Sequence, residues 1–279
     1  MQVFFSHKCL EYKQDGHPES PARVKSIYKH IKDKFDFSEP EPCTDKDLVL
    51  CHEKGLINRI RHRDFSGADT PNLPQMFGFA KLSAGSAIEA AQHAVNGENA
   101  FSLSRPPGHH AGKDFLGGFC YFNSIAVAVK KILEKVDKVA IIDIDGHHGN
   151  GTQDIMIGNK DVVFVSLHQK NAFPVSGFVS ERNCFNYPLV PGTNGREYVK
   201  VFDSALENVE KFSPDIIAVS AGFDAYKKDP LLELALDIAT YFEIADMISH
   251  LGVPVFSVLE GGYSEEIGKC VHEFLKGLG

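Results

Sequence analysis

Short apolar runs that are rich in Val and Ile recur along the chain of 279 residues. Continuous apolar runs of this length are typical of strands that are buried on both faces of a parallel sheet. Turn-forming and polar residues follow most of the runs, which fits strands of limited length. The pattern predicts strands at Gln2–Phe5, Ala100–Leu103, Val139–Ile144, Val162–Leu167, Ile216–Ser220 and Val253–Leu259.

Longer segments with helical periodicity alternate with these runs. Predicted helices are Pro21–Phe35, Ser83–Val95, Asn123–Val136, Arg196–Phe212, Leu234–His250 and Glu265–Leu278, and the first has a Ser-Pro start signal. The alternation predicts an α/β fold in which helices flank a parallel sheet. Because no repeat, low-complexity tract or dividing linker is evident, residues 1–279 are expected to form one domain. The loop-rich stretch Arg61–Gln75 is expected to join elements inside it.

The charge balance and the cysteines narrow the class of protein. The net charge is -8, so the chain has no bulk attraction for nucleic acid or for an anionic membrane, and neither is expected as a partner. No apolar run approaches the roughly 20 residues that span a bilayer. The first ten residues lack the basic region of a signal peptide. The six cysteines form no CxxC pair, so we expect free thiols in a reducing cytoplasm.

Polar clusters follow five of the predicted strands, and they identify a candidate site. The clusters are rich in Gly, His, Asp and Tyr, and they lie at residues 104–110, 145–150, 166–168, 221–224 and 260–263. Ligands of parallel α/β sheets bind beyond the carboxyl ends of the strands. Five such ends at one edge therefore predict a binding or catalytic site there.

Two of these clusters contain candidate metal ligands. Asp145 and His147 are two residues apart at a strand end, where alternate side chains point to the same side. Asp224 follows another strand and can complete a set of two carboxylates and one imidazole. Three protein ligands with an open position are typical of a catalytic zinc site, although the mixed oxygen and nitrogen donors also suit Fe²⁺. By itself, the Asp-x-His pair is equally compatible with a polar loop.

The remaining clusters offer groups for proton transfer and charge stabilisation. His109 and His110 follow Pro-Pro-Gly, which favours a tight turn, and imidazole carries protons near neutral pH. Tyr263 follows two glycines, and its phenol can donate a hydrogen bond to a developing oxyanion. Taken alone, the two histidines can also be surface loop residues, and Tyr263 can be an ordinary half-buried tyrosine.

Taken together, the motifs resemble the histone deacetylase and acetylpolyamine amidohydrolase family, and most closely its class II-like bacterial and archaeal members. In family order they are HPESPAR at 17–23, RPPGHH at 105–110, GGFCYFN at 117–123, DIDGHHGNGTQ at 143–153, SLH at 166–168, AGFDAYKKDP at 221–230 and EGGY at 260–263. The resemblance covers most of the chain and implies the arginase-deacetylase fold, with metal-assisted amide hydrolysis at the strand ends.

The resemblance also assigns roles to the polar residues. It implies zinc ligands at Asp145, His147 and Asp224, a general base at His110, an oxyanion donor at Tyr263, and His109 as an electrostatic partner that is backed by Asp143. It further implies an inner potassium site formed by Asp143, Ser166 and Leu167 together with Asp145 and His147. Asn150 stands behind the base, where some members have Asp. An amide orients the ring without a charge, so we expect a lower pKa for His110 than a carboxylate partner would give.

A substrate channel is implied as well, with Gly118, Phe119, Phe173, Leu231 and a rim aspartate, Asp69. We therefore expect hydrolysis of N-acyl-lysine in peptides or proteins to the free amine and acetate. Position 231 is Leu where some polyamine-selective relatives carry Glu, and no long insertion precedes Ala80. Two alternatives remain: a deacetylase of small acetylated amines such as acetylpolyamines, and a non-catalytic reader of acyl-lysine.

Overall fold

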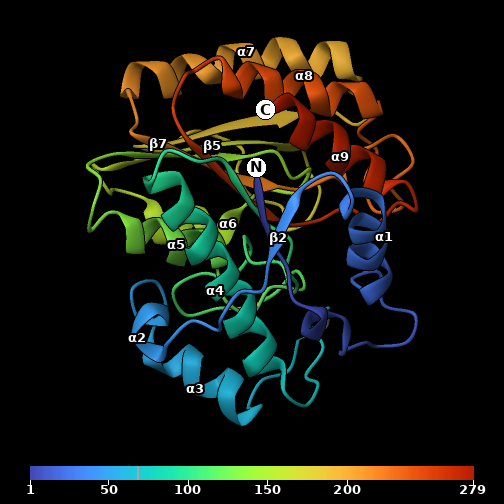
Figure 1. Ribbon diagram of the computed structural model, residues 1–279. Helices are drawn as coiled ribbons and strands as arrows, with labels where there is room; N and C mark the ends of the chain where they lie inside the picture. The colour runs from blue at the N-terminus through green and yellow to red at the C-terminus, as the bar shows by residue number, and fades with distance from the viewer. Residues whose placement is uncertain (68) are drawn as a thin grey trace.

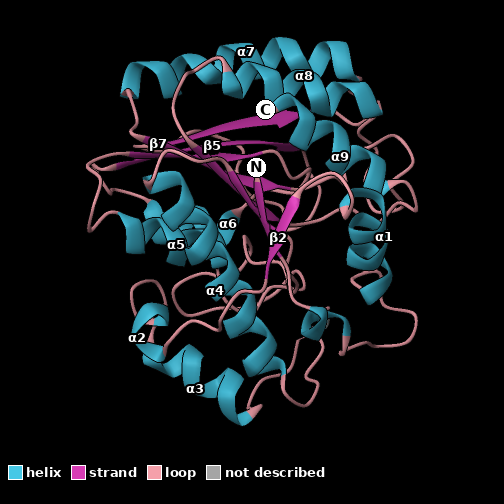
Figure 2. Ribbon diagram, viewed as in Figure 1, coloured by secondary structure: helices cyan, strands magenta, loops and turns pink. Residues whose placement is uncertain are grey.

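The apolar runs form the strands of one central sheet (Figures 1 and 2). The computed structural model describes residues 1–67 and 69–279, and in these residues eight strands pair in the order β2-β1-β3-β8-β7-β4-β5-β6. Every neighbouring pair is parallel. The strands are β1 (Gln2–Phe4), β2 (Asp36–Ser38), β3 (Ala100–Ser102), β4 (Val139–Asp143), β5 (Val162–Gln169), β6 (Cys184–Leu189), β7 (Ile216–Ala221) and β8 (Val255–Leu259).

Helices cover both faces of this sheet. One face carries α1 (Pro21–Ile31), α7 (Gly195–Phe212), α8 (Ile238–Ser249) and α9 (Ile267–Gly277), together with the short 3-10 helix His7–Leu10. The other face carries α2 (Asp45–Leu48), α3 (Lys54–His62), α4 (Met76–Val95), α5 (Ser124–Ile132) and α6 (Asn150–Met156). The α/β architecture with flanking helices is thus confirmed.

Burial on both faces explains why the central strands are continuous apolar runs. In β4, Ala140 and Ile142 pack into the core beneath α7 and α8, whereas Val139 and Ile141 pack into the core on the opposite face. Successive side chains of a strand point to opposite faces, so each face needs apolar residues at every second position. All six predicted strands are present, with ends that differ by at most two residues.

The predictions missed two strands, and both lie at the edges of the sheet. β2 has only three residues, of which Asp36 and Ser38 are exposed, and β6 contains Pro188. An edge strand has one unpaired side, so it tolerates proline and polar residues that the pattern of a buried strand excludes. The short helices α2, α3 and α6 and the 3-10 helix were also missed.

Some predicted helix limits were wrong. α4 begins at Met76, seven residues before the predicted start, and α3 extends to His62, so the irregular stretch is shorter than predicted. α8 begins at Ile238, because Ala235 and Leu236 instead form bridges with Asn194 and Tyr226. One residue of the predicted loop, Ala68, lies outside the described residues.

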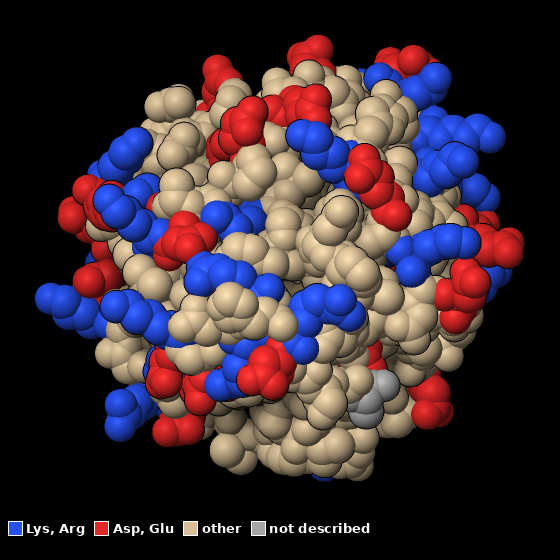
Figure 3. Space-filling view, turned by 90° about the horizontal axis from the view of Figure 1, so that it is seen from below, with Lys and Arg blue, Asp and Glu red and all other residues tan. Residues whose placement is uncertain are grey.

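Charged side chains of both signs are interspersed on the face in Figure 3. Ion pairs join some of the surface charges of the molecule, such as those of Asp45 with Arg61 and with Lys81. Such mixing differs from the continuous basic stripe that is typical of nucleic-acid-binding surfaces. Among the described residues, no helix has the length and apolar character needed to cross a membrane.

The strand order brings distant parts of the chain to one edge of the sheet. β3, β8, β7, β4 and β5 are consecutive neighbours, and the polar clusters that follow them leave the sheet at the same end. The clusters after β3 and β8 are about 150 residues apart in sequence but next to each other in the sheet, because β3 pairs with β8.

Candidate active site

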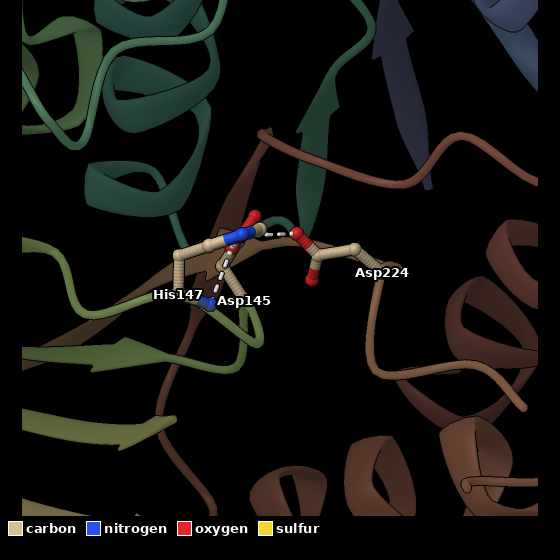
Figure 4. A group of neighbouring side chains, drawn as sticks. All are labelled: Asp145, His147 and Asp224. Atoms are coloured by element: carbon tan, nitrogen blue, oxygen red, sulfur yellow. Dashed lines mark hydrogen bonds and ion pairs between the residues drawn. The ribbon is translucent and has the colours of Figure 1, made fainter. Parts of the chain in front are cut away.

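Asp145, His147 and Asp224 form a compact group at this edge (Figure 4). Asp145 and His147 follow β4, Asp224 follows β7, and one ligand atom from each residue lies within 4.8 Å of the other two. The His147 Nδ1 atom is 2.7 Å from Asp224 Oδ2 and 3.2 Å from Asp145 Oδ1. The arrangement matches the predicted ligand set of two carboxylates and one imidazole.

The electrostatics of this group suit a divalent cation. Both carboxylates are fully buried, and their burial together with their mutual repulsion raises the pKa of Asp224. Although burial acts to lower the pKa of His147, the Asp224 and Asp145 carboxylates raise it to about 10. Two buried carboxylates that draw a positive charge onto the imidazole between them are a donor set that a cation can stabilise.

Backbone groups orient the two carboxylates. The Gly146 N–H donates to Asp224 Oδ1 at 2.6 Å, and the Gly261 N–H donates to Asp145 Oδ2 at 2.7 Å. A Cβ atom at position 261 would lie 2.5 Å from oxygens of both Asp145 and Asp224. Gly261 is therefore needed for the loop after β8 to approach the carboxylates.

The tandem histidines have different partners and different proton affinities. His109 Nδ1 donates to Asp143 Oδ2 at 3.0 Å, and His110 Nδ1 donates to Asn150 Oδ1 at 2.8 Å. Burial acts to lower the pKa of His109, but the Asp145 and Asp143 carboxylates raise it well above its usual range. Burial and the neighbouring His109 and His147 rings hold the pKa of His110 well below its usual range. The pair thus combines a neutral imidazole with a charged one.

The low pKa of His110 therefore has a cause beyond the one considered from the sequence. We expected a low value because Asn150 replaces a carboxylate. In the structure, burial and the two neighbouring imidazoles lower the pKa of His110, and the hydrogen bond that His110 donates to Asn150 acts in the opposite direction.

Tyr263 is held from several sides. Its backbone N–H donates to Asp229 Oδ2 at 2.6 Å, and its ring lies edge-on to Phe119 with centroids 5.8 Å apart. The Arg23 guanidinium lies 4.7 Å from the centroid of the ring and donates to the carbonyl of Gly262. Burial raises the pKa of Tyr263 well above its usual range, so the phenol remains a hydrogen-bond donor.

A cavity of about 270 Å³ joins these groups to the surface. The predicted residues that line it are Asp69, His109, His110, Gly118, Phe119, Asp145, His147, Phe173, Leu231 and Tyr263. Phe173 and Leu231 are 45% and 41% exposed, so they lie at the open end. The cavity therefore leads from an apolar surface to buried ionisable groups.

Gly118 and Asp69 shape one wall of this cavity. Gly118 has a φ of +55°, and a Cβ atom there would lie 2.3 Å from Cδ2 of His110 and 2.8 Å from Cε1 of Phe173. Asp69 Oδ2 accepts a hydrogen bond from the Gly118 N–H at 3.1 Å. A side chain at position 118 would therefore displace the His110 and Phe173 rings. The hydrogen bond to Asp69 holds the backbone of Gly118 in this position.

Five predicted residues lie outside the cavity lining, and one of them is Asp224, which belongs to the candidate metal group behind the lining. Asp143 and Asn150 stand behind the two histidines. Ser166 and Leu167 are buried in β5, where Ser166 pairs in register with Asp143 and its hydroxyl lies 2.9 Å from His168 Nδ1. Of the residues predicted for the potassium site, Asp143 at the end of β4 and Ser166 within β5 are thus neighbours in the sheet.

The analysis of the sequence missed three buried residues that brace the site. Glu260 accepts hydrogen bonds from the N–H groups of Gly108 and His109. Arg23 donates to the carbonyls of Glu260 and Gly262, and Asp229 accepts from Tyr263. Burial raises the pKa of both the Glu260 and the Asp229 carboxyl to about 7. All three residues lie in the motifs quoted above, and their place in these motifs is the only feature of the sequence that could have identified them.

Comparison with known proteins identifies the family. The model of the histone deacetylase domain matches residues 17–278. A "probable deacetylase" of Methanothermobacter thermautotrophicus is 36% identical over 299 residues, which cover 100% of this chain and 90% of the relative. The acetylpolyamine amidohydrolase of Mycoplana ramosa is 39% identical over 226 residues, which cover 76% of this chain and 66% of the relative.

A solved structure agrees with these relatives. The HD domain of HDA15 superposes with a TM-score of 0.93 at 31% identity, covering 100% of this chain and 91% of that chain. The alignment therefore includes the whole sheet and every polar cluster described above. Sequence and structure together show that the chain belongs to the histone deacetylase family of metal-dependent amidohydrolases.

Proposed function

We propose that the chain acts as one catalytic domain, a zinc-dependent deacetylase that hydrolyses N-acyl-lysine in peptides or proteins. The observation that carries this proposal is the cavity, whose open end is apolar and whose inner end holds Asp145, His147, His110 and Tyr263. An apolar tube suits the neutral four-carbon stem of an acylated lysine. A non-catalytic reader is not retained, because the family is one of hydrolases.

The residues divide the chemistry among them. Asp145, His147 and Asp224 would hold a divalent ion, which we propose is Zn²⁺, and this ion would supply Lewis-acid polarisation of the acyl carbonyl and a lower pKa for water. His110 is neutral, and Asn150 holds its Nδ1 proton, so Nε2 is free to accept a proton from the attacking water.

Charge stabilisation and the second proton transfer follow. The Tyr263 hydroxyl donates a hydrogen bond to the oxyanion that forms when water attacks the carbonyl carbon. His109 stays cationic between Asp143 and Asp145, which balances the buried carboxylates around the site. A protonated histidine of the pair returns a proton to the leaving nitrogen, so the products are the free amine and the carboxylic acid.

We also propose a structural potassium ion at Asp143, Ser166 and Leu167, with Asp145 and His147. The in-register pairing of Asp143 with Ser166 supports this, because it puts a buried carboxylate beside a buried hydroxyl. Oxygen donors of this kind suit hard cations.

Removal of the Tyr263 hydroxyl tests the oxyanion assignment. We expect Tyr263→Phe to lower kcat by about 10²–10³, as with other oxyanion donors. The ring contacts with Phe119 and Arg23 remain in this variant, so metal content and thermal stability should not change. Steady-state kinetics on the zinc-loaded protein measure the effect. Full activity of the variant would rule out a role for the phenol.

Acetylpolyamine hydrolysis is the second candidate function, because relatives bear the name acetylpolyamine amidohydrolase. A free polyamine brings an ammonium group to the cavity, and its desolvation is costly without a carboxylate partner. Position 231 at the open end is Leu, and the Asp69 carboxylate is already engaged by Gly118 and Thr70. These features favour an acylated lysine as the substrate.

The ratio of kcat/KM for the two kinds of substrate distinguishes the two functions. We expect kcat/KM for an acetyl-lysine peptide to exceed that for acetylspermidine, with both measured on one zinc-loaded preparation. Leu231→Glu should shift the ratio toward acetylspermidine by about tenfold, since one well-placed charge pair is worth about 1–2 kcal/mol. Leu231→Gln is the matched control, because it adds polarity without charge. A wild-type ratio strongly in favour of acetylspermidine would establish the second function instead.

A further inference from the structure

The motif at residues 221–230 contains a second aspartate, Asp229, to which the chemistry above gives no task. This carboxylate is buried, with 8% of its surface exposed, and both of its oxygens accept backbone hydrogen bonds. Oδ2 accepts from the Tyr263 N–H at 2.6 Å, and Oδ1 accepts from the Leu231 N–H at 3.0 Å. One side chain therefore ties together two residues that line the cavity and are 32 positions apart in sequence.

The loop that carries Tyr263 is held by several hydrogen bonds at the residues before Tyr263, including one from the Phe223 N–H to the Gly261 carbonyl. Its two preceding residues are Gly261 and Gly262, which have no side chains to pack, and Gly262 has a φ of +114°. The carbonyl of Gly262 is held by Arg23, and the N–H of Gly261 is held by Asp145. Asp229 supplies the one contact to the backbone of Tyr263 itself among the hydrogen bonds of the described residues.

The anchor matters because hydrogen bonds to an oxyanion are sensitive to placement. A donor must lie within about 2.7–3.1 Å of the developing charge. A phenol that shifts by about 1 Å loses most of this stabilisation, and such a misplacement can cost up to about 10²-fold in rate. Leu231 lines the open end of the cavity, so the same carboxylate also links this end to the reacting end.

We propose that Asp229 is a positioning residue, which sets the Tyr263 hydroxyl for the oxyanion and fixes it relative to the cavity wall at Leu231. The proposal rests on the proposed function, because it acts through Tyr263 as the oxyanion donor.

The first test is Asp229→Asn. The amide oxygen can still accept one backbone N–H, but the amide NH2 group then faces the other N–H, so one of the two bonds is lost. We expect kcat to fall by about 10- to 100-fold. KM should change by less than about threefold, because the interaction is made chiefly in the transition state. Zinc content should equal that of the wild type.

Asp215→Asn is the matched control. Asp215 also accepts two backbone hydrogen bonds through its carboxylate, from Asp137 and Lys138, but it precedes β7, at the opposite end of the strand from the site. We expect wild-type kinetics from this variant. A loss of zinc in Asp229→Asn would overturn the proposal, because the residue would then act through Asp224.

A double-mutant cycle with Tyr263→Phe separates positioning from general structural damage. If Asp229 acts through the hydroxyl, Asp229→Asn should change kcat by less than about threefold in the Tyr263→Phe background, since the two effects share one interaction. Multiplicative losses would overturn the proposal. A fully active Tyr263→Phe chain would instead refute the assigned role of the phenol, which is a failure of the proposed function as well.

Hydrogen exchange gives a measurement that needs no substrate. We expect the Tyr263 amide proton to exchange about tenfold faster or more in Asp229→Asn than in the wild type, because its acceptor is lost. Amide protons of the central strand β4 should exchange at wild-type rates in both variants. Unchanged exchange at Tyr263 would overturn the proposal for Asp229, whatever the activity of the chain. Inactivity of the wild type toward every acylated amine tried would instead count against the proposed function alone.

Discussion

The Asp224→Ala chain is expected to lose its catalytic metal and essentially all of its activity. Asp224 is one of the three residues that we propose as ligands and is fully buried, so no exposed group can replace its oxygen. Lewis-acid catalysis is worth several kcal/mol, and its loss should lower turnover by at least about 10³-fold. Elemental analysis of the purified protein measures the metal, and kcat/KM on an acylated amine measures the activity.

Thermal unfolding gives a second measurement of the same change. A ligand that binds only the folded chain stabilises it by about 4 kcal/mol when its free concentration is about 1,000 times Kd. Added Zn²⁺ should therefore raise the Tm of the wild type and leave the Tm of Asp224→Ala unchanged.

Asp224→Asn is the control for folding in this experiment. The amide oxygen of the asparagine can still accept the hydrogen bond from the Gly146 N–H, so the loop after β7 should keep its conformation. The amide lacks the negative charge that holds a divalent ion, and it should also bind metal weakly. Full zinc occupancy in both variants would show that the ion binds elsewhere.

The central part of the fold could be predicted because its physical pattern is unambiguous. β4, β5, β7 and β8 are buried on both faces, so most of their residues are apolar and the runs are visible in the sequence. β2 and β6 could not be found in this way. Each lies at an edge of the sheet, where Asp36 and Pro188 cost little because one side of the strand is unpaired.

The site could be predicted only in part for a related reason. Asp145 and His147 are near each other in the sequence and follow one strand, so their common target could be inferred from spacing. The partners that hold the site together are distant in sequence. Glu260 bonds to a residue 152 positions away, and Arg23 bonds to one 239 positions away. No local periodicity encodes such pairs, and only the order of the strands brings them together.

The His110→Ala chain is expected to keep its metal and lose most of its turnover. His110 does not belong to the ligand set, and the neutral imidazole is the group best prepared to accept a proton in the cavity. General-base catalysis contributes about 10²–10⁴ in rate, so kcat should fall by that factor. Kinetics and zinc analysis on the same preparation separate this loss from the loss expected of Asp224→Ala.

Two further variants decide which histidine is the base. Asn150→Ala removes the acceptor that holds the Nδ1 proton of His110, so it should lower kcat by a smaller factor, about tenfold, through loss of the correct tautomer in part of the molecules. His109→Ala removes a cation between Asp143 and Asp145 but leaves the Nε2 atom of His110 available. Its effect on kcat should therefore be smaller than that of His110→Ala. If His109→Ala is far more damaging while zinc remains bound, the two histidines have the opposite roles, and the charged imidazole beside Asp143 is the essential one.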